Sequence, residues 1–359
     1  MNVHVRPVIT PEAEETLEDL ADSLAIPESR YEQAERSYKA LGDWLNRPAS
    51  SMQQFDPQVH VQGSFGLGTV IPPISDGEHY DVDAVCEFRK LSKSQTTQQN
   101  LKQLLGDEMK LYAHAQNMNK PVGEHRRCWR LDYADGAQFH MDVTPGLLNS
   151  AEQRALLLAH GLDARFADTA IAITDIDHHA YRIVSSDWPR SNPRGYLKWF
   201  LSRMEVIFEE RKRELIRKGV RAGTEPIPFY AVRTPLQSAV MILKRHRDIM
   251  FVARSDERPI SIILTTLAAH AYGGEAKISD AIHYPERYGP VHRQGTRRQL
   301  RRGQPERSHR KLRGQVAQTS GASGGVLRMA RPGSTRLRAR RGTLQQAAHH
   351  RDPRQIDRS

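Results

Sequence analysis

Apolar residues in the first half of the chain recur with two different periods. After Pro27 they are spaced three and four residues apart, which places them on one side of an α-helix. The residues of this stripe are Tyr31, Ala34, Tyr38, Leu41 and Leu45. Similar spacing predicts further helices over residues 94–118, 151–167, 195–218, 234–248 and 259–272. Helices are therefore expected before, within and after a region that follows a different pattern.

In that region, apolar residues alternate with polar ones, as in half-buried β-strands. A short extended run ending at Val61 is followed by a second run, residues 79–85, that carries Asp81 and Asp83. Successive side chains of a strand point to opposite faces, so the two aspartates share one face, roughly 7 Å apart. Tyr80, Val82 and Ala84 then face the other way, where a helix could cover them.

Two later runs predict a β-hairpin. Residues 128–133 and 138–143 both have strand character, and the segment between them contains Asp135-Gly136. An Asp-Gly pair between alternating runs is a strong hairpin signal. In the second run the residues of one face are Phe139, Met141 and Val143, and those of the other are His140 and Asp142. If this hairpin lies beside the first aspartate strand, Asp142 completes a cluster of three carboxylates.

A glycine-rich turn precedes the aspartate strand. Gly63 and Ser64 directly follow the first extended run, and Gly66 and Gly68 come next. Backbone amides in such a turn can hold phosphate, and the two later glycines permit close approach of a ligand. The alternative is an ordinary surface loop. Beside two carboxylates, however, the turn indicates a site for Mg²⁺ and a nucleoside triphosphate.

Three convergent carboxylates suit a pair of metal ions. In such sites two Mg²⁺ ions lie about 4 Å apart, one activating an attacking hydroxyl and the other neutralising the leaving phosphates. Asp81, Asp83 and Asp142 are the predicted metal ligands and catalytic residues, and Gly63 and Ser64 are the predicted triphosphate contacts.

These residues resemble a known active-site signature. Gly63-Ser64, the Asp81-x-Asp83 pair and the later Asp142 are similar to the signature of the polymerase-β-type nucleotidyltransferases. The stretches 234–248 and 259–272 resemble the second lobe of the bacterial cGAS/DncV-like nucleotidyltransferases, also called CD-NTases. The resemblance covers residues 28–282.

The resemblance implies an activity. Members of this family make cyclic di- or trinucleotide signals from NTPs, ATP among them, in anti-phage defence, and the product acts on an effector protein. It also implies that Lys244 and Ser261 contact the triphosphate. Each has an ordinary alternative, because Lys244 belongs to a basic cluster that could satisfy a helix dipole and Ser261 could be an N-cap.

The implied fold is α+β, and the expected domains follow from it. Residues 1–27 form a leader with a helix beginning at Thr10-Pro11-Glu12, residues 28–165 a polymerase-β-like catalytic lobe with a small mixed sheet, and residues 166–282 a helical second lobe. Within the second lobe, residues 168–194 are expected to be a long polar connection. Thr144-Pro145-Gly146 is expected to end the last strand of the catalytic lobe.

Residues 283–359 differ in composition from the rest. They contain 19 of the 53 Lys and Arg residues but only 4 of the 42 Asp and Glu residues, so the net charge of +11 comes from them and the preceding chain is mildly acidic. Leu, Ile, Val and Phe make up 9 of these 77 residues, too few for a packed core. Three interpretations remain open: a basic tail that binds nucleic acid or an acidic partner, a solubilising extension, or a reading frame that slips near residue 282, which the arginine-rich composition favours.

The cysteines, the absence of long apolar runs and the histidines limit the possible location and function of the protein. The two cysteines, Cys86 and Cys128, lie in strand-like runs and indicate a reducing compartment. With no signal peptide or membrane-spanning run, a cytoplasmic protein without membrane contact is expected. The adjacent His178 and His179 are expected to be solvated rather than metal-bound. Two other functions remain possible: nucleotide transfer to RNA or protein, and non-catalytic nucleic-acid binding through the basic tail.

Overall fold

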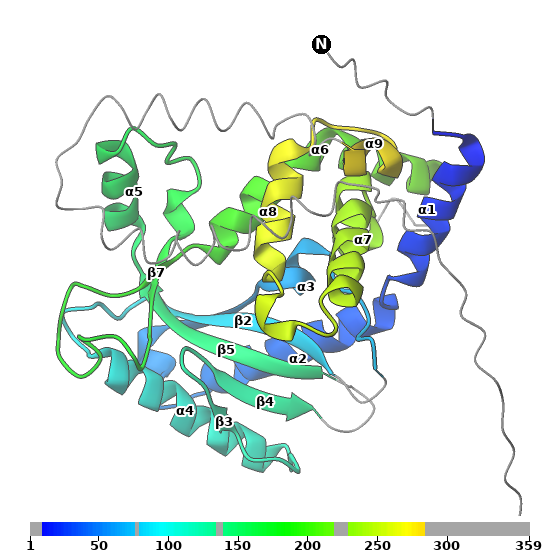
Figure 1. The fold of residues 1–359 in the computed structure, drawn as a ribbon. Coiled ribbons are helices and arrows are strands. Elements are labelled where there is room, and N and C mark those ends of the chain that lie inside the picture. The colour runs from blue at the N-terminus through cyan, green and yellow to red at the C-terminus, as the bar shows by residue number, and fades with distance from the viewer. Residues whose placement is uncertain (1–8, 76–78, 134–138, 219–228, 284–359) are drawn as a thin grey trace, which may run out of the picture. The chain divides into compact units, whose positions relative to one another are not determined.

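The computed structural model describes residues 9–75, 79–133, 139–218 and 229–283 (Figure 1). By their contacts the residues divide into two units, 1–304 and 305–359. All described residues belong to the first unit, and the fold below is the fold of that unit alone.

A mixed sheet forms the centre of the fold. Its main strands lie in the order β1-β2-β5-β4-β3, and β6 and β7 extend it beside the end of β5. The β2–β5 pair is parallel, and the other pairs are antiparallel. The strands are β1 (Pro57–Val61), β2 (Tyr80–Phe88), β3 (Gly123–Glu124), β4 (Trp129–Tyr133), β5 (Phe139–Leu148), β6 (Ile171–Ile173) and β7 (Arg190–Ser191). The prediction of a small mixed sheet within an α+β fold is confirmed.

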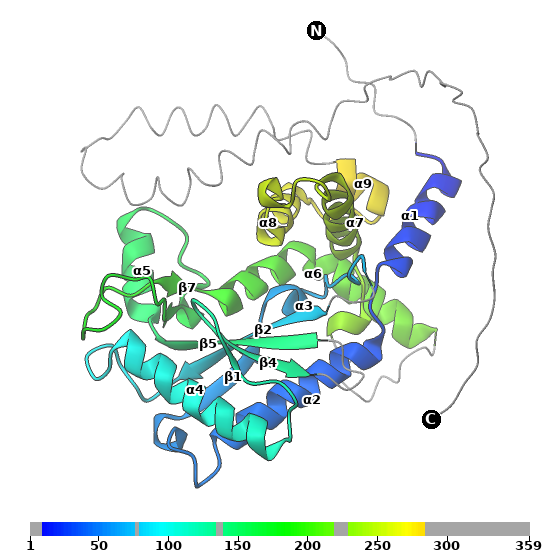
Figure 2. The same cartoon turned by 60° about the horizontal axis from the view of Figure 1, so that its bottom comes forward.

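Two long helices cover one face of this sheet. Figure 2 shows α2 (Glu28–Leu45) and α4 (Gln98–Ala115) below the strands. Leu41 of α2 and Leu101 of α4 belong to one buried cluster with Val82, Met141 and Val143 of the strands. The predicted alternation is therefore correct: the apolar residues of β2 and β5 face these helices, and the polar face remains for the site.

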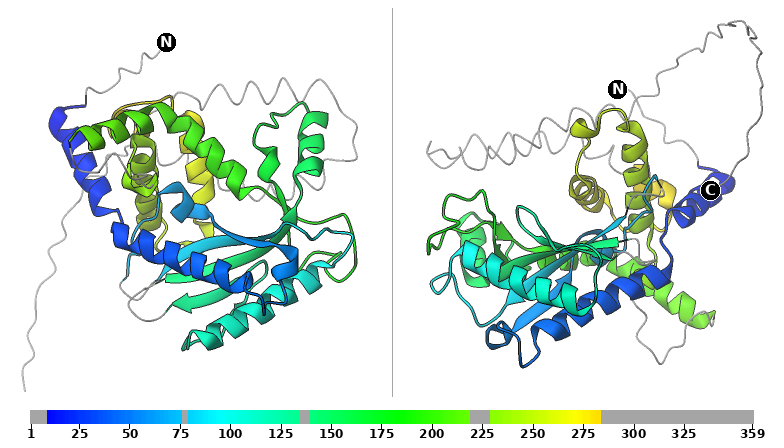
Figure 3. Two further views of the ribbon diagram at one scale, coloured as in Figure 1. Left: turned by 180° about the vertical axis from the view of Figure 1, so that it is seen from behind. Right: turned by 90° about the horizontal axis from the view of Figure 1, so that it is seen from below.

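Helices on the other side form a second cluster. The view from behind in Figure 3 shows α6 (Pro193–Arg217) crossing above the sheet, beside α7 (Pro235–Met250). Phe200, Leu236 and Tyr272 are buried there together with Leu67. The remaining elements are α1 (Pro11–Ser23), η1 (Gln53–Phe55), α3 (Gly63–Leu67), α5 (Ser150–Ala159), η2 (Ala167–Thr169), η3 (Phe229–Ala231), η4 (Ser255–Glu257), α8 (Ser261–Ala271) and α9 (Ile278–His283).

The start of α7 is tied to the end of α3. Thr234 caps α7 with its hydroxyl and Gln237 completes a capping box. The Gln237 side-chain amide also donates to the Leu67 carbonyl over 3.0 Å. Helix α7 is thus attached directly to the segment that carries Gly63 and Ser64.

Three local predictions were wrong, each because of a contact that the local pattern did not reveal. Residues 63–67 form a short helix rather than a loop, and Gly68 ends it in the left-handed conformation. Strand β5 continues through Pro145 to Leu148 instead of stopping at Thr144. Pro145 lies between the last pair with β4, at Val143, and the first pair with β6, at Gly146, where a residue without an N–H is tolerated.

The third wrong prediction concerns the segment after β5. The helix predicted to reach residue 167 ends at Ala159, because Gly161 adopts a left-handed φ of 66° and the Leu162 N–H returns to the Leu157 carbonyl over 2.8 Å. The supposed connection 168–194 contains β6 and β7. It is anchored by buried Asp175, which accepts hydrogen bonds from Arg126 and Arg127.

The Arg-rich segment 283–359 lies almost entirely outside the described residues, as does the predicted turn at Asp135-Gly136. The interpretations of that segment therefore stay predictions. Among the described helices, none is both long and apolar enough to cross a bilayer.

Two helix-interior glycines predict opposite responses to alanine. At Gly42 of α2 an added Cβ would lie 3.8 Å from Val59, an ordinary contact, so Gly42→Ala should stabilise the fold by up to about 1 kcal/mol through helix propensity. At Gly106 of α4 the same Cβ would collide with the Trp129 ring, so Gly106→Ala should destabilise the fold by about 1–3 kcal/mol. Urea unfolding of both variants measures the difference, and a stabilised Gly106→Ala variant would contradict the packing of α4 on β4.

Candidate active site

The pairing of β2 with β5 brings the three predicted carboxylates together. The parallel register places Asp83 directly beside Asp142 and Asp81 beside His140. Neighbouring strands lie about 4.8 Å apart, so side chains on the same face of this pair are in reach of one ligand. Because Val82, Met141 and Val143 are fully buried on the opposite face, the three aspartates point away from the core.

Gly63 packs directly against Asp83. The Gln62 N–H donates to the Asp83 carbonyl over 2.7 Å, and Gly63 follows with a φ of 62°. A side chain at position 63 would require this left-handed conformation and would collide with the Asp83 carboxylate. Glycine is therefore required here, and α3 begins at this residue, with Ser64 next in the helix.

Two basic residues lie on the same face: Arg130, which sequence reasoning missed, and His140, which it placed beside Asp142 without a role. Arg130 of β4 pairs with Asp142 across the strands and binds both carboxylate oxygens, Nε to Oδ1 and Nη2 to Oδ2, each over 2.7 Å. The His140 ring nitrogen Nε2 contacts the Asp81 carboxylate. The sequence predicts the hairpin but not its register, so the position of Arg130 opposite Asp142 could not be found from the sequence.

These contacts give Asp81 and Asp83 different acidities. Burial, and then the neighbouring Asp81 and Asp142 carboxylates, raise the pKa of Asp83 to about 6. The hydrogen bond from His140 lowers the pKa of Asp81, against the opposing effect of burial. Asp142 in turn raises the pKa of the Arg130 guanidinium. Negative charge is therefore concentrated around Asp83, whereas Arg130 partly neutralises Asp142 and His140 binds Asp81.

The chemistry of these groups fits Mg²⁺. Three carboxylates on adjacent strands offer the hard oxygen ligands that Mg²⁺ prefers. Burial, and then the charges of Asp81 and Asp142, raise the pKa of Asp83, and a divalent cation would oppose both effects by stabilising the carboxylate.

Lys244 lies in the interior near this turn. It is buried in α7, and its Nζ donates to the Thr69 carbonyl over 2.8 Å and to the Thr69 hydroxyl over 3.3 Å. Burial, and then the charge of Arg247, lower the pKa of Lys244 to about 8, whereas Asp248 and Asp83 act in the opposite sense. The helix-dipole alternative for Lys244 is wrong, because this side chain binds the residues that follow α3.

Ser261 has another partner. It is the first residue of α8, and its hydroxyl accepts a hydrogen bond from Arg247 over 2.7 Å. The N-cap alternative is wrong, because Ile260 occupies the N-cap and no side chain caps the helix. The structure connects Ser261 to the basic end of α7, and no recorded contact links it to the three carboxylates.

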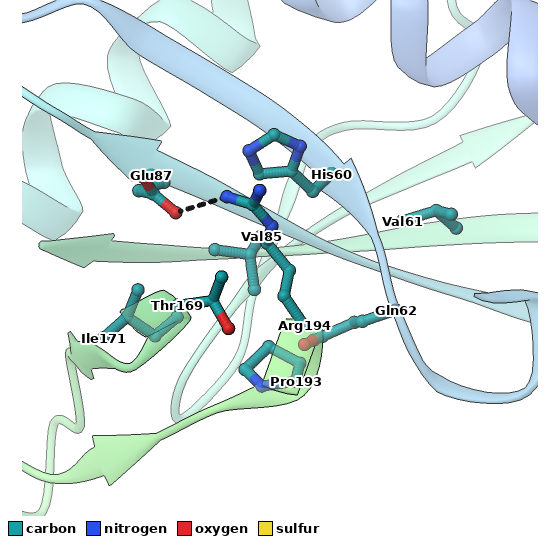
Figure 4. Close-up of a pocket in the computed structure, with 9 residues that line it drawn as sticks. All are labelled: His60, Val61, Gln62, Val85, Glu87, Thr169, Ile171, Pro193 and Arg194. Atoms are coloured by element: carbon teal, nitrogen blue, oxygen red, sulfur yellow. Dashed lines mark hydrogen bonds and ion pairs between the residues drawn. The ribbon is translucent and has the colours of Figure 1, made fainter. Parts of the chain in front are cut away.

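Further along the same face, β2 contacts α6. Glu87 is buried, and its Oε2 lies 3.4 Å from Nη1 of Arg194 in α6 (Figure 4). The small cavity around them is too narrow for a water molecule, so this region is a packing contact and not a ligand pocket. It fixes the beginning of α6 on the strand that carries Asp81 and Asp83.

Two histidine-containing groups have the proximity that a metal ion needs. His79, Asp132 and His140 have ligand atoms within 4.8 Å of one another, and so do His178, His179 and Asp187. His179 is exposed, whereas His178 is half-buried and its ring contacts the Gln98 amide over 3.1 Å. That neither histidine binds a metal stays a prediction.

In this mixed sheet, two parallel strands bring three aspartates together beside Gly63 and Ser64. This fold and site are those of a nucleotidyltransferase. The family model of the cyclic GMP-AMP synthase DncV-like nucleotidyltransferase domain matches residues 57–145. These residues belong to the family of DncV-like nucleotidyltransferase domains, which confirms the resemblance to the bacterial CD-NTases.

Relatives extend the similarity beyond this domain. The chain is 30% identical over 267 residues to a c-di-GMP synthase of Roseivirga ehrenbergii and 23% identical over 267 residues to the cyclic dinucleotide synthase CdnG of Bradyrhizobium diazoefficiens. The matches cover 74% and 71% of this chain, and the chain spans 62% and 58% of the length of those proteins.

A solved structure shares the fold. The Bradyrhizobium diazoefficiens CD-NTase CdnG in complex with GTP superimposes with a TM-score of 0.55, covering 77% of this chain and 75% of that chain at 19% identity.

The pKa of Asp83 is raised and that of Asp81 is lowered, so replacement of each by asparagine should change the stability of the fold in a different way. The pKa of Asp83 is 3.8 in an unperturbed chain and about 6 in the fold. The ionised carboxylate therefore destabilises the fold above about pH 6, and this destabilisation disappears as the pH falls below about 4. Without divalent cations, Asp83→Asn should therefore stabilise the fold by about 1–3 kcal/mol at pH 7.5 and by much less at pH 4.

Asp81→Asn is the matched control. The lowered pKa of Asp81 contributes stability at neutral pH that is lost on acidification, so this variant should be no more stable than the wild type at pH 7.5. Urea unfolding at the two pH values checks both, and stabilisation by Asp81→Asn but not by Asp83→Asn would contradict the assigned charge distribution.

Proposed function

We propose that this chain is a Mg²⁺-dependent nucleotidyltransferase that joins NTPs into a cyclic di- or trinucleotide and releases pyrophosphate. The observation that carries the proposal is the β2–β5 register, which sets Asp83 beside Asp142 next to Gly63. The names of the relatives support a cyclic dinucleotide as the product.

In the proposed reaction, a 3′- or 2′-hydroxyl of one nucleotide forms a bond to the α-phosphorus of another, and the bond between that phosphorus and the β-phosphate oxygen breaks. Asp142 orients the hydroxyl or accepts its proton, and pyrophosphate leaves. Asp81, Asp83 and Asp142 would hold two Mg²⁺ ions, which supply charge neutralisation and hydroxyl activation when bound. A second transfer closes the ring.

The turn and the second lobe bind the triphosphate in this proposal. Gly63 and Ser64 donate through backbone and hydroxyl groups, and Lys244 supplies a positive charge behind them. The position of Lys244 on Thr69, directly after α3, supports this role. Ser261 would act through Arg247, because the two side chains are hydrogen-bonded.

The proposed biological role follows from the family. The NTP substrates include ATP, and the cyclic product serves anti-phage defence by activating an effector protein that never needs to touch this chain. The domain boundaries at residues 28, 166 and 283, and a cytoplasmic location, belong to the same proposal. Transfer to RNA or protein is the alternative, and it requires an added polymer.

A labelling assay tests the activity. The protein is incubated with each α-³²P-labelled NTP, the other unlabelled NTPs and Mg²⁺, and the products are treated with phosphatase before chromatography. Phosphatase-resistant products are expected from the wild type. Asp83→Asn should reduce their formation by about 10³-fold or more, because it removes a ligand of the transition-state cations.

Asp107→Asn is the control for this loss. It makes the same isosteric change at an exposed carboxylate of α4 that pairs only with Lys110 and Gln103 among its recorded contacts, so its activity should match the wild type. If NTPs are consumed only after RNA or protein is added, cyclic nucleotide synthesis is refuted in favour of the alternative. If Asp83→Asn keeps full activity, the assigned site is wrong.

A further inference from the structure

Arg130 occupies the oxygens through which Asp142 would bind a cation. The bidentate contact uses both Oδ1 and Oδ2 of Asp142, and Nη2 of Arg130 also lies 3.9 Å from Oδ1 of Asp81. The geometry follows from the fold, because β4 and β5 pair Arg130 with Asp142 across the strands. The pairing of β4 with β5 thus fixes the guanidinium beside the carboxylates.

This pair opposes cation binding. A guanidinium and a carboxylate joined by two charge-assisted hydrogen bonds form one of the stronger polar contacts in proteins. A divalent cation that approaches Asp142 meets a fixed positive charge at both oxygens, in a half-buried site where charges are less screened than in water. Arg130 cannot lose its charge by deprotonation, so it can stop opposing the cation only by moving.

The phosphates of a bound nucleotide offer the Arg130 guanidinium an alternative partner to Asp142. Its planar fork binds phosphate oxygens as well as it binds a carboxylate. The side chain is 28% exposed, so it borders the open side of the site and is not enclosed in the core. Lys244 binds Thr69, so among the described contacts Arg130 is the cation that binds Asp142.

We propose that Arg130 is the counter-ion of Asp142 in the metal-free protein and moves to a nucleotide phosphate when divalent cations occupy Asp142. Arg130 is then a positioning residue that makes cation binding depend on nucleotide binding. The site binds cations weakly when it is empty and strongly when a triphosphate is present to accept the guanidinium. This inference rests on the proposed function.

Mn²⁺ binding without nucleotide tests the first half of the proposal. Free Mn²⁺ is measured by electron paramagnetic resonance in titrations of the wild type, Arg130→Gln and Arg130→Lys. Removal of the charge should tighten Mn²⁺ binding by about tenfold, whereas Lys, which keeps the charge, should leave it near the wild-type value. Arg130→Met is a second neutral variant if Arg130→Gln does not fold.

Addition of a non-hydrolysable ATP analogue tests the second half. In the wild type the analogue should tighten Mn²⁺ binding strongly, and in Arg130→Gln this gain should shrink by about tenfold, because the displaced guanidinium no longer binds phosphate. Arg154→Gln is the matched control, since it removes an exposed guanidinium that pairs with exposed Asp168, and it should change neither titration.

The outcomes separate this inference from the proposed function. If Mn²⁺ binds the wild type and is lost in Asp83→Asn, but binds Arg130→Gln with unchanged or lower affinity, the role of Arg130 is overturned and the metal site stands. If the wild type binds neither Mn²⁺ nor the analogue, both the proposed function and this inference are overturned.

Discussion

The parallel register of β2 against β5 is the constraint on which the site depends. It aligns Asp83 with Asp142 and Asp81 with His140, and it turns Val82, Met141 and Val143 toward α2 and α4. A shift of either strand by one residue would send its carboxylates to the buried face and its apolar side chains to the open one. The buried cluster behind the sheet therefore maintains the positions of the charged groups in front of it. Gly63 adds a second requirement, since only glycine permits α3 to begin against Asp83.

The site holds its charges in a poorly compensated arrangement that favours function over stability. Asp83, with a pKa raised to about 6, lies beside two other carboxylates. Arg130 binds Asp142, His140 binds Asp81 and Lys244 binds Thr69, so none of these contacts reaches the Asp83 carboxylate. Like charges this close destabilise the folded chain at neutral pH. The contacts that compensate lie elsewhere, in the core cluster and in the Asp175 ion pairs with Arg126 and Arg127. Such arrangements are typical of sites that receive a charged ligand.

Much of this arrangement could be predicted from the sequence, because strand alternation is a local property. The alternation placed Asp81 with Asp83 and His140 with Asp142, and the Asp-Gly pair predicted the β4–β5 pairing that the structure shows. The meeting of β2 with β5 was only a conditional expectation, since residues 81 and 142 are far apart in sequence and no local signal specifies their pairing. Arg130 was missed, because its place opposite Asp142 depends on the register of the hairpin, which the Asp-Gly pair alone does not specify.

Other errors came from contacts at long range. Helix α3 replaced the expected loop because Gly68 ends it and the Leu67 carbonyl binds Gln237, which lies 170 residues further along the chain. The place of Lys244 on Thr69, across 175 residues, was equally invisible to periodicity. Helical spacing predicted that α7 and α8 exist, but it could not predict which of their polar residues turn inward.

The central claim is that the three aspartates share divalent cations beside Gly63. The most direct measurement is X-ray diffraction at the manganese absorption edge from crystals grown with Mn²⁺ and a non-hydrolysable NTP. The account predicts anomalous density between the carboxylates of Asp81, Asp83 and Asp142, with the triphosphate against Gly63 and Ser64. Manganese bound elsewhere while these carboxylates contact only Arg130 and His140 would contradict it.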